Sequence, residues 1–425
     1  MKNITIIIPA FNEEKTIGNI INEFNKSKNI SEIIVVDNNS TDQTNKISKL
    51  NHAKVISCKE QGYGYAVKKG IQLSNNDLIF KIDADIKNPD YKWIDILLKN
   101  MIKENSMLVK GYWNNSEDSM PVTNLVAKPL IQNNYPDLKY IKMPLSGIYL
   151  FNKSILTIDY MQNNFAFDLD LMISIYNLQY KISQEFLGDV YDTLKPISNY
   201  SNMSHDLITF IENRKKYNKS ILLFMAHPDD AEIWCGGLIA KYSLKYSNIH
   251  IVIATSDSIR KKESLKIKDT FPNINIEFME NEELTNFYNK QNINHLYNLI
   301  EAIKPDIFIT HHKDDIHVDH KQCFDIATSA FLKMPRKALP EKLLMCNSYF
   351  QENHNTFSPS VYIDTTETMD IKLKLIENFK SQEVTFWKEM AKKIDSLNGL
   401  KSSVEFAEAY EEYTFYTINR AKSTV

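Results

Sequence analysis

An apolar run ends in two carboxylates at Leu78-Ile79-Phe80-Lys81-Ile82-Asp83-Ala84-Asp85. The run has the length and composition of a buried strand. Two carboxylates directly behind such a strand offer the oxygen ligands that Mg²⁺ or Mn²⁺ prefers. A cation held there neutralises the two phosphates of a nucleotide sugar as the sugar leaves. We therefore expect a divalent-cation site and a nucleotide-sugar donor at the end of this strand.

Short β-branched runs alternate with amphipathic stretches on both sides of it. Strands are predicted at residues 4–8, 32–36, 54–57, 78–82 and 107–110, and helices at 14–28, 41–49, 63–73 and 91–103. This alternation is typical of a mostly parallel sheet covered by helices. After Gly111 the pattern loosens into a proline-punctuated stretch, where loops can build an acceptor site, before a helix near residue 168 and a strand at 181–187.

A second alternation follows a helix predicted at 204–217. Its strands are expected at 221–225, 249–255, 275–279 and 306–310, and its helices at 235–246, 260–270, 291–303 and 320–333. A chain of 425 residues exceeds what one core usually fills. We predict an α/β protein with two Rossmann-like domains, residues 1–215 and 216–425, whose ligands gather at the carboxyl ends of strands.

Composition and charge disfavour some partners. A net charge of −3 and a pI near 6.4 give no long-range attraction for nucleic acid or an anionic membrane. The four cysteines, which lack CxxC spacing, are expected to be buried and reduced. No apolar run approaches the roughly 18 residues that span a bilayer, and the first residues lack a signal-peptide pattern. We expect a cytoplasmic protein without membrane insertion.

Three motifs around the Asp-x-Asp triplet occur in order along the chain. They are Ile8-Pro9-Ala10-Phe11-Asn12-Glu13-Glu14 after the first strand, Val35-Val36-Asp37-Asn38-Asn39-Ser40-Thr41-Asp42 after the second, and Gly62-Tyr63-Gly64 before the helix that precedes the triplet. Together they resemble the GT-A glycosyltransferases of the broad family 2 type. This resemblance implies a GT-A nucleotide-sugar-binding fold for the first domain.

A narrower resemblance covers about residues 1–210. It rests on Leu108-Val109-Lys110-Gly111-Tyr112, on residues 122–130, on Pro144-Leu145-Ser146-Gly147, and on Gln184-Glu185-Phe186-Leu187-Gly188. These segments resemble the glucosyl-3-phosphoglycerate synthase group, which are retaining enzymes. The resemblance implies a UDP-sugar donor held by Pro9, Ala10, Asn12, Glu13, Asp37, Asp83 and Lys110, a cation on Asp85, and substrate contacts from Thr123 and Gly147.

The acceptor side departs from that group. Met120-Pro121 stands where the group has an arginine for the acceptor phosphate, and Asp192 stands where it has a metal-binding histidine. We therefore expect an acceptor other than 3-phosphoglycerate, with Asp192 as a further cation ligand. Asp168 takes the place of the acidic residue near the reacting sugar, and Asp170 is the alternative if the register is shifted.

The second domain carries a different set of polar residues. Ala226-His227-Pro228-Asp229-Asp230 leaves a predicted strand, and His317-Val318-Asp319-His320 opens a predicted helix. Hydrolytic zinc takes three protein ligands and activates a water at the fourth position. His227, Asp230 and His320 suit the ligands. Asp229 suits a general base, and His317, oriented by Asp319, Asp315 or both, suits a donor to the oxyanion or the leaving amine.

These motifs, together with Glu232 and Cys235-Gly236-Gly237, resemble the PIG-L/LmbE family of zinc deacetylases, which act on N-acetylglucosamine conjugates. The likeness extends to Arg260 with Glu263, to Ser381-Gln382 and to Phe406-Ala407-Glu408-Ala409-Tyr410. It implies that Arg260 contacts the sugar. An acidic substrate contact falls among Glu280, Glu282 and Glu283, which the sequence does not separate. His311 and His312 are either further zinc ligands or histidines that pack locally.

The two resemblances together imply a bifunctional enzyme. The first domain would transfer N-acetylglucosamine from UDP-GlcNAc to an acceptor, with retention, and the second would deacetylate the product; the sugar is inferred from the fusion. In a second hypothesis only the deacetylase is active and the first domain is a binding module. In a third, the acceptor belongs to a polymer, such as a hydroxymethylated base in viral DNA or a surface glycan. The near-neutral charge disfavours DNA.

Overall fold

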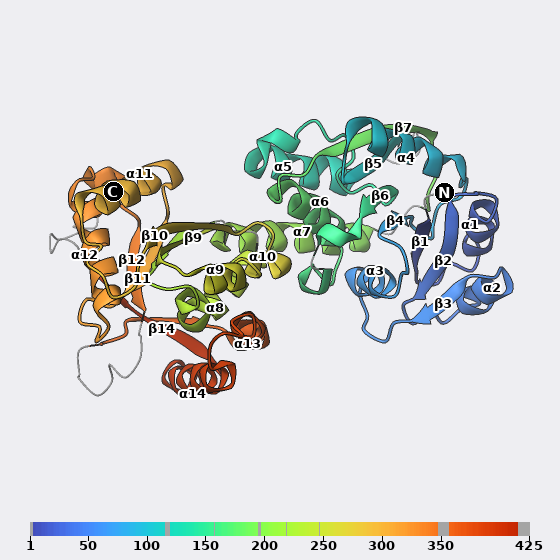
Figure 1. Cartoon of the computed structure of the whole chain (residues 1–425). Helices are drawn as coiled ribbons and strands as arrows, with labels where there is room; N and C mark the ends of the chain where they lie inside the picture. The colour runs from blue at the N-terminus through green and yellow to red at the C-terminus, as the bar shows by residue number, and fades with distance from the viewer. Residues whose placement is uncertain are drawn as a thin grey trace. The chain divides into compact units, whose positions relative to one another are not determined.

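The computed structural model describes residues 3–114, 120–156, 158–193, 197–217, 219–245, 247–346 and 357–414. The chain divides into two compact units, Met1–Lys215 and Lys216–Val425. Within the described residues each unit contains a seven-stranded sheet with helices on its faces (Figure 1). The predicted α/β class with two Rossmann-like sheets is confirmed.

The sheet of the first unit has the strand order β3-β2-β1-β4-β6-β5-β7. Its strands are β1 (Ile4–Ala10), β2 (Ile30–Asp37), β3 (Lys54–Ser57), β4 (Leu78–Lys81), β5 (Leu108–Asn114), β6 (Tyr149–Asn152) and β7 (Ile182–Asp189). All five strands predicted before Gly111 are present. The unpredicted β6 lies between β4 and β5 and runs antiparallel to both. The sheet is therefore mixed where β6 separates the Asp-x-Asp strand β4 from the Lys110 strand β5.

Helices cover both faces of this sheet. They are α1 (Ile17–Phe24), α2 (Thr44–Leu50), α3 (Tyr63–Gln72), α4 (Lys92–Glu104), α5 (Lys128–Asn134), α6 (Phe167–Asn177) and α7 (Ile197–Tyr217). Alternation along β1 sends Ile4, Ile6 and Ile8 to one face, where they pack with α1 and α4. Ile7 points to the other face, where α3, α6 and α7 supply the core.

The second unit has the strand order β10-β9-β8-β11-β12-β14-β13. Its strands are β8 (Ser220–Met225), β9 (Asn248–Thr255), β10 (Asn275–Asn281), β11 (Ile307–His311), β12 (Lys342–Cys346), β13 (Val361–Asp364) and β14 (Ala407–Glu412). The four predicted strands are the parallel β8 to β11. The unpredicted β14 is antiparallel to both β12 and β13.

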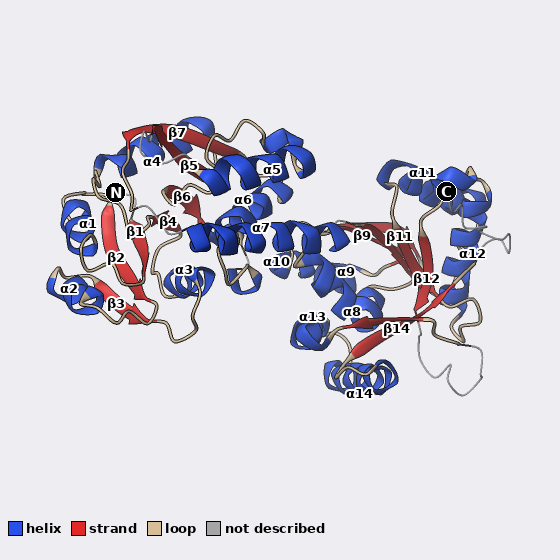
Figure 2. Ribbon diagram, turned by 180° about the vertical axis from the view of Figure 1, so that it is seen from behind, coloured by secondary structure: helices blue, strands red, loops and turns tan. Residues whose placement is uncertain are grey.

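Two groups of helices enclose the second sheet (Figure 2). They are α8 (Asp230–Ser243), α9 (Ser258–Ser264), α10 (Ile267–Thr270), α11 (Lys290–Ile303), α12 (Val318–Leu332), α13 (Met369–Ile376) and α14 (Val384–Ser402). Side chains of α8, α13 and α14 form the core on one face, and those of α11 and α12 on the other. The single helix expected at 260–270 is two helices, α9 and α10.

The four cysteines are buried and form no disulfide. Among the helices that the structure describes, none combines the length and the apolar character needed to cross a membrane.

Candidate active sites

The loops after β1 and β2 are joined to each other by hydrogen bonds. The Asn12 backbone N–H donates to Ser40 Oγ at 3.0 Å, and the Thr41 N–H donates to Asn12 Oδ1 at 2.8 Å. The Glu13 N–H donates to Thr44 Oγ1 at 2.7 Å. Asn12 has a φ of 58°, a left-handed conformation that asparagine tolerates better than most residues. These contacts hold two predicted donor residues, Asn12 and Glu13, against the loop after β2.

Asp37 closes β2 within the same network. Its carboxylate accepts from the Ser40 N–H at 3.0 Å and from Asn45 Nδ2 at 2.9 Å. Pro9 and Ala10 pair with Val36 and Asp37 in the β1–β2 register, so these three predicted donor residues share one edge of the sheet.

Asp83 lies directly against Gly147. A Cβ atom added at residue 147 would lie 1.6 Å from Asp83 Oδ2, so a residue with a side chain would displace the carboxylate. The structure thus brings together a predicted donor contact and a predicted substrate contact.

Asp168 is the second residue of α6 and belongs to the same cluster as Asp83 and Gly147. Its Oδ1 accepts from the Tyr149 hydroxyl at 2.6 Å and its Oδ2 from the Tyr63 hydroxyl at 2.7 Å. Burial, together with the Asp168 charge, raises the pKa of both tyrosines well above the usual range, so both hydroxyls stay protonated and donate. Tyr63 also lies 3.5 Å from Asp83 Oδ1.

The alternative Asp170 has a different environment. It accepts from Arg214 Nη1 at 2.8 Å and from the Gln162 N–H at 3.0 Å, so it ties α6 to α7 and to the preceding loop. The contacts therefore favour Asp168 over Asp170 as the acidic residue near the reacting sugar.

Lys110 points into the same region from β5. Its buried ammonium donates to the Ser146 carbonyl at 2.9 Å and lies 4.5 Å from the centre of the Tyr149 ring. Burial lowers the pKa of Lys110 to about 8, although the Asp168 carboxylate opposes the shift.

Asp85 and Asp192 lie in two segments that run beside each other. The Lys87 N–H donates to the Tyr191 carbonyl at 2.8 Å, and the Thr193 hydroxyl donates to the Asp85 carbonyl at 3.4 Å. Asp192 stands between those two contacts, which places both predicted cation ligands in the same neighbourhood. Thr123 is buried at the start of a short π-helix, Thr123–Ala127, ahead of α5.

In the second unit the Asp230 carboxylate lies beside both histidines that were predicted as zinc ligands. Among the described residues, two sets offer ligand atoms that all lie within 4.8 Å of one another: His227 with His317 and His320, and Asp230 with His311 and His320. Asp230 Oδ2 lies 3.2 Å from His227 Nδ1 and 3.5 Å from His320 Nε2. It also accepts the His227 backbone N–H at 2.8 Å, which fixes the turn between β8 and α8. Two imidazoles and one carboxylate form a donor set that zinc favours, and all three residues are at least nine-tenths buried.

Asp315 and Asp319 orient the ligand histidines. Asp315 Oδ2 lies 2.9 Å from His320 Nδ1, and Asp319 Oδ2 lies 3.2 Å from His227 Nε2. Such carboxylate partners fix the tautomer and the ring orientation of metal-binding histidines. Asp319, Asp315 or both were expected to orient His317. Instead, His317 Nδ1 accepts the Asp319 backbone N–H at 3.2 Å as the N-cap of α12.

His317 and Asp229 flank the ligands. The His317 ring centre lies 4.7 Å from those of both His227 and His320. Asp229 precedes α8 with a φ of 113°, a strained conformation for a residue with a side chain. Burial, reinforced by the Asp230 charge, raises the pKa of Asp229 to about 8. One carboxyl and one imidazole are thus positioned beside the ligands, as the proton-transfer roles require.

His311 and His312 are engaged in local contacts. The Ala226 N–H donates to His311 Nε2 at 2.9 Å, and the His311 ring stacks on His320 at 3.7 Å. His312 Nδ1 accepts the Asp314 N–H at 3.2 Å. These contacts favour local packing for His312. His311 fits either role, because Asp230, His311 and His320 also offer ligand atoms within 4.8 Å of one another, and His311 Nε2 lies 3.3 Å from Asp230 Oδ2. The sequence alone did not show that His311 supports the ring of a ligand.

Arg260 lies on α9 between two carboxylates. Its Nε donates to Asp257 Oδ2 at 2.7 Å, and its Nη2 pairs with Glu283. Of the other candidate acids, Glu280 pairs with Lys261. Glu283 is therefore the glutamate that the structure associates with the predicted sugar contact.

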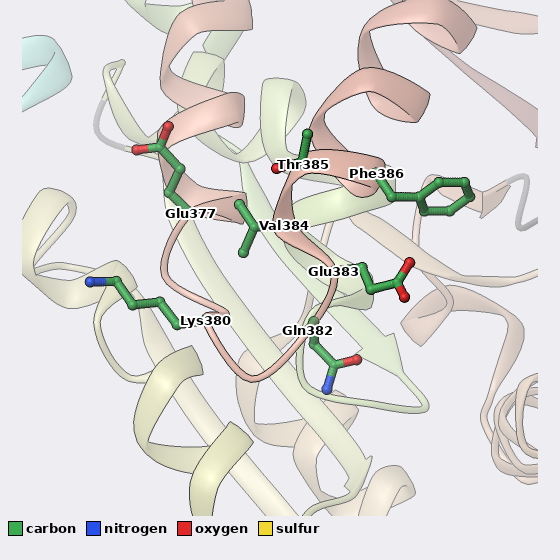
Figure 3. A pocket seen from close by; sticks show the side chains of 7 residues that line it. All are labelled: Glu377, Lys380, Gln382, Glu383, Val384, Thr385 and Phe386. Carbon is green, nitrogen blue, oxygen red and sulfur yellow. The ribbon is translucent and has the colours of Figure 1, made fainter.

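One turn along α9, Glu263 accepts from the backbone N–H and the hydroxyl of Ser381 at 3.0 and 2.5 Å. These bonds anchor the loop between α13 and α14 to the helix that carries Arg260. An open cavity of about 730 Å³ lies over this loop, lined by residues 377, 380 and 382–386. Figure 3 shows the lining side chains pointing apart rather than toward a common point, so we assign the cavity no chemistry.

Two family models match the chain. Residues 5–148 match glycosyl transferase family 2, and residues 222–331 match the GlcNAc-PI de-N-acetylase (PIG-L) family. The matches lie in the first and the second unit, respectively. They confirm the two resemblances found in the sequence.

Curated relatives align with the first half of the chain. Glucosyl-3-phosphoglycerate synthase of Mycolicibacterium smegmatis is 26% identical over 254 residues, which cover 54% of this chain and 84% of the relative. The enzyme of the same name from Petrotoga mobilis is 28% identical over 245 residues, covering 51% and 74%. Protein RfbJ of Shigella flexneri is 32% identical over 109 residues, covering 26% and 84%.

A solved structure also aligns with this half. Glucosyl-3-phosphoglycerate synthase from Mycobacterium tuberculosis, in complex with Mn²⁺, UDP-glucose and phosphoglyceric acid, aligns with a TM-score of 0.45 at 25% identity, covering 50% of this chain and 79% of that one.

Proposed function

Because the chain carries a family 2 glycosyltransferase domain close to the glucosyl-3-phosphoglycerate synthases, followed by a domain of the PIG-L family, we propose that it is a bifunctional enzyme. The first domain transfers N-acetylglucosamine from UDP-GlcNAc to an acceptor, with retention. The second domain hydrolyses the N-acetyl group to leave a glucosaminyl conjugate. The observation that carries the proposal is the placement of Asp230 beside His227 and His320 in a chain whose other unit gathers Asp83, Lys110 and Asp168.

In the transferase site, Asp85 and Asp192 hold Mg²⁺ or Mn²⁺, which neutralises the diphosphate of the donor. The Pro9–Glu13 segment and Asp37 bind the nucleotide. Hydrogen bonds within and between the loops after β1 and β2 hold these residues in place. Asp83 and Asp168 face the sugar. Lys110 supplies positive charge to the leaving diphosphate.

In the deacetylase site, His227, Asp230 and His320 hold zinc, which supplies an activated water at neutral pH. Asp229 would accept the proton of that water, because it adjoins the ligands without being one of them. The charge of zinc on those ligands would lower the Asp229 pKa from the value of about 8 that burial and Asp230 give it, so that the carboxylate is available as a base. His317 donates a proton to the leaving amine. Arg260 binds the sugar hydroxyls with its guanidinium held between Asp257 and Glu283.

The proposal is tested by incubating the protein with UDP-GlcNAc, Mn²⁺, zinc and a panel of acceptors. The panel should include 3-phosphoglycerate, other small hydroxy compounds and hydroxymethylated DNA. We expect UDP release, a glycosylated product and acetate release with one member of the panel. Absence of both transfer and acetate release across the panel would count against the proposal.

Replacing Asp85 with alanine should remove transfer and spare deacetylation. Without this carboxylate the cation loses a ligand, and the charge of the leaving diphosphate is not neutralised. Loss of a partner outside the ligand shell already costs about 10- to 100-fold in metal affinity or activity, so loss of a direct ligand should cost at least as much. The measurement is UDP release, with acetate release from a preformed N-acetylglucosaminyl conjugate as the second readout. Asp95→Ala, which removes a carboxylate bonded to Asn29, is the matched control. Unchanged product formation in Asp85→Ala would instead favour a first domain that only binds.

Donor binding should weaken as the pH rises through about 8, the value to which burial lowers the pKa of Lys110 from 10.5. Donor affinity falls with rising pH because the Lys110 ammonium attracts the diphosphate below that pH, whereas the neutral amine above it does not. Bound diphosphate stabilises the charged form, so the observed midpoint lies at or above that value. Calorimetric titration with UDP-GlcNAc and Mn²⁺ on both sides of pH 8 measures the effect. Lys110→Met should flatten the profile, and an equally steep profile in that variant would contradict the assignment.

A further inference from the structure

Lys81 is a charged residue in the centre of the first sheet, and its side chain is 0% exposed. It occupies the last position of β4, where the preceding residues Leu78, Ile79 and Phe80 are apolar. A buried ammonium is costly unless it is paired, and an apolar residue would pack there without that cost. The position therefore calls for an explanation beyond core packing.

The register of the sheet explains what surrounds this lysine. Lys81 pairs with Tyr149 across β4 and β6, and Tyr149 pairs with Lys110 across β6 and β5. The three side chains thus form a row on one face of the sheet, with the Lys81 and Lys110 nitrogens 5.5 and 4.5 Å from the centre of the Tyr149 ring.

Two carboxylates balance the two ammonium groups. Lys81 Nζ is hydrogen-bonded to Asp83 Oδ1 and lies 3.8 Å from Asp168 Oδ2. It also lies 4.7 Å from the centre of the Tyr63 ring, whose hydroxyl donates to Asp168. Lys81 is therefore the cation that Asp83 and Asp168 share.

Asp83 is the exposed member of its ion pair with Lys81. The Asp83 side chain is 31% exposed, whereas Lys81 is fully covered. Because Lys81 Nζ is hydrogen-bonded to Asp83 and adjoins Asp168, we expect it to act on the donor through these two carboxylates. The hydrogen bonds that lock the nucleotide-side loops run among Asn12, Ser40 and Thr41 and do not include Lys81.

We propose that Lys81 is a positioning residue that fixes Asp83 and Asp168 for the sugar portion of the donor. This inference rests on the proposed transferase function and adds a residue to it. Without the ammonium, the two carboxylates repel each other and lose the orientation that Tyr63 and Tyr149 alone do not impose. The sugar hydroxyls then lose the carboxylates that accept their hydrogen bonds, while the groups that bind the uridine and the diphosphate are unchanged.

The test is calorimetric titration of the full chain with Mn²⁺ plus either UDP or UDP-GlcNAc. Lys81→Met should weaken UDP-GlcNAc binding by about tenfold or more and UDP binding by less than about threefold, as expected for lost charge-assisted hydrogen bonds at the sugar. Lys81→Arg, which keeps the charge, should retain more of the UDP-GlcNAc affinity than Lys81→Met. If Lys81→Met does not fold, Lys81→Gln replaces it with a polar side chain of similar length.

Lys68→Met is the matched control, because Lys68 is also a buried lysine of this unit but donates only to the carbonyls of Asp159 and Met161. It should leave both affinities unchanged. Equal losses for UDP and UDP-GlcNAc, or no loss, in the folded Lys81 variants would overturn the inference. Wild-type protein that binds neither ligand would count against the transferase function itself.

Discussion

Replacing His227 with alanine is expected to empty the zinc site and abolish deacetylation while sparing transfer. His227 Nδ1 and His320 Nε2 are the two nitrogens beside Asp230 Oδ2, so the variant leaves one imidazole and one carboxylate. Two ligands do not hold zinc at the affinity of three, and the activated water is lost with the metal. The measurements are zinc content after dialysis, acetate release from an N-acetylglucosaminyl conjugate, and UDP release from UDP-GlcNAc.

The control for this variant is His295→Ala, because His295 lies on α11 and pairs with Glu277. It should keep both the metal and the activity. Stoichiometric zinc together with a wild-type deacetylation rate in His227→Ala would rule out His227 as a ligand.

Replacing Asp229 with alanine should have a different effect, retaining zinc but lowering the deacetylation rate by about two to four orders of magnitude. Asp229 is buried next to Asp230 but is not one of the three proposed ligands. In the proposed mechanism its carboxylate takes the proton of the water, which alanine cannot do. Asp229→Asn keeps the shape and tolerates the positive φ of 113°, so it removes the basicity alone. Both variants should keep zinc, and retained deacetylation in either would assign the base to another residue.

Much of the fold was predictable because the local sequence of each central strand indicates its structure. The runs that form β1, β2, β4 and β8 are apolar and end in polar residues, which marks both the strand and its carboxyl end. By contrast, β14 reads Ala-Glu-Ala-Tyr-Glu-Glu, without an apolar alternation. Its Glu408 is buried because it accepts from Gly237, Leu238 and Lys372, partners that lie far away in the sequence.

The candidate zinc ligands could be named from local sequence for the same reason. His227 and Asp230 are three residues apart on one turn, and His320 lies in the first turn of α12. The residues that contact these candidate ligands were not predictable in the same way. The contacts of Asp315 with His320, Asp319 with His227 and His311 with His320 depend on how α12 and β11 approach β8. The role of Lys81 depends on the register of β6, a four-residue strand that the sequence did not signal.

In the proposed bifunctional enzyme, one sugar is first coupled and then deacetylated by the same chain. The most direct test supplies UDP-GlcNAc labelled with ¹³C in the sugar ring and ²H in the acetyl group, together with a small-molecule extract of the producing cells, and follows both labels by mass spectrometry. We expect a product that carries the ¹³C label without the ²H label, together with deuterated free acetate. A product that keeps both labels, or deuterated acetate without any ¹³C-labelled conjugate, would contradict it.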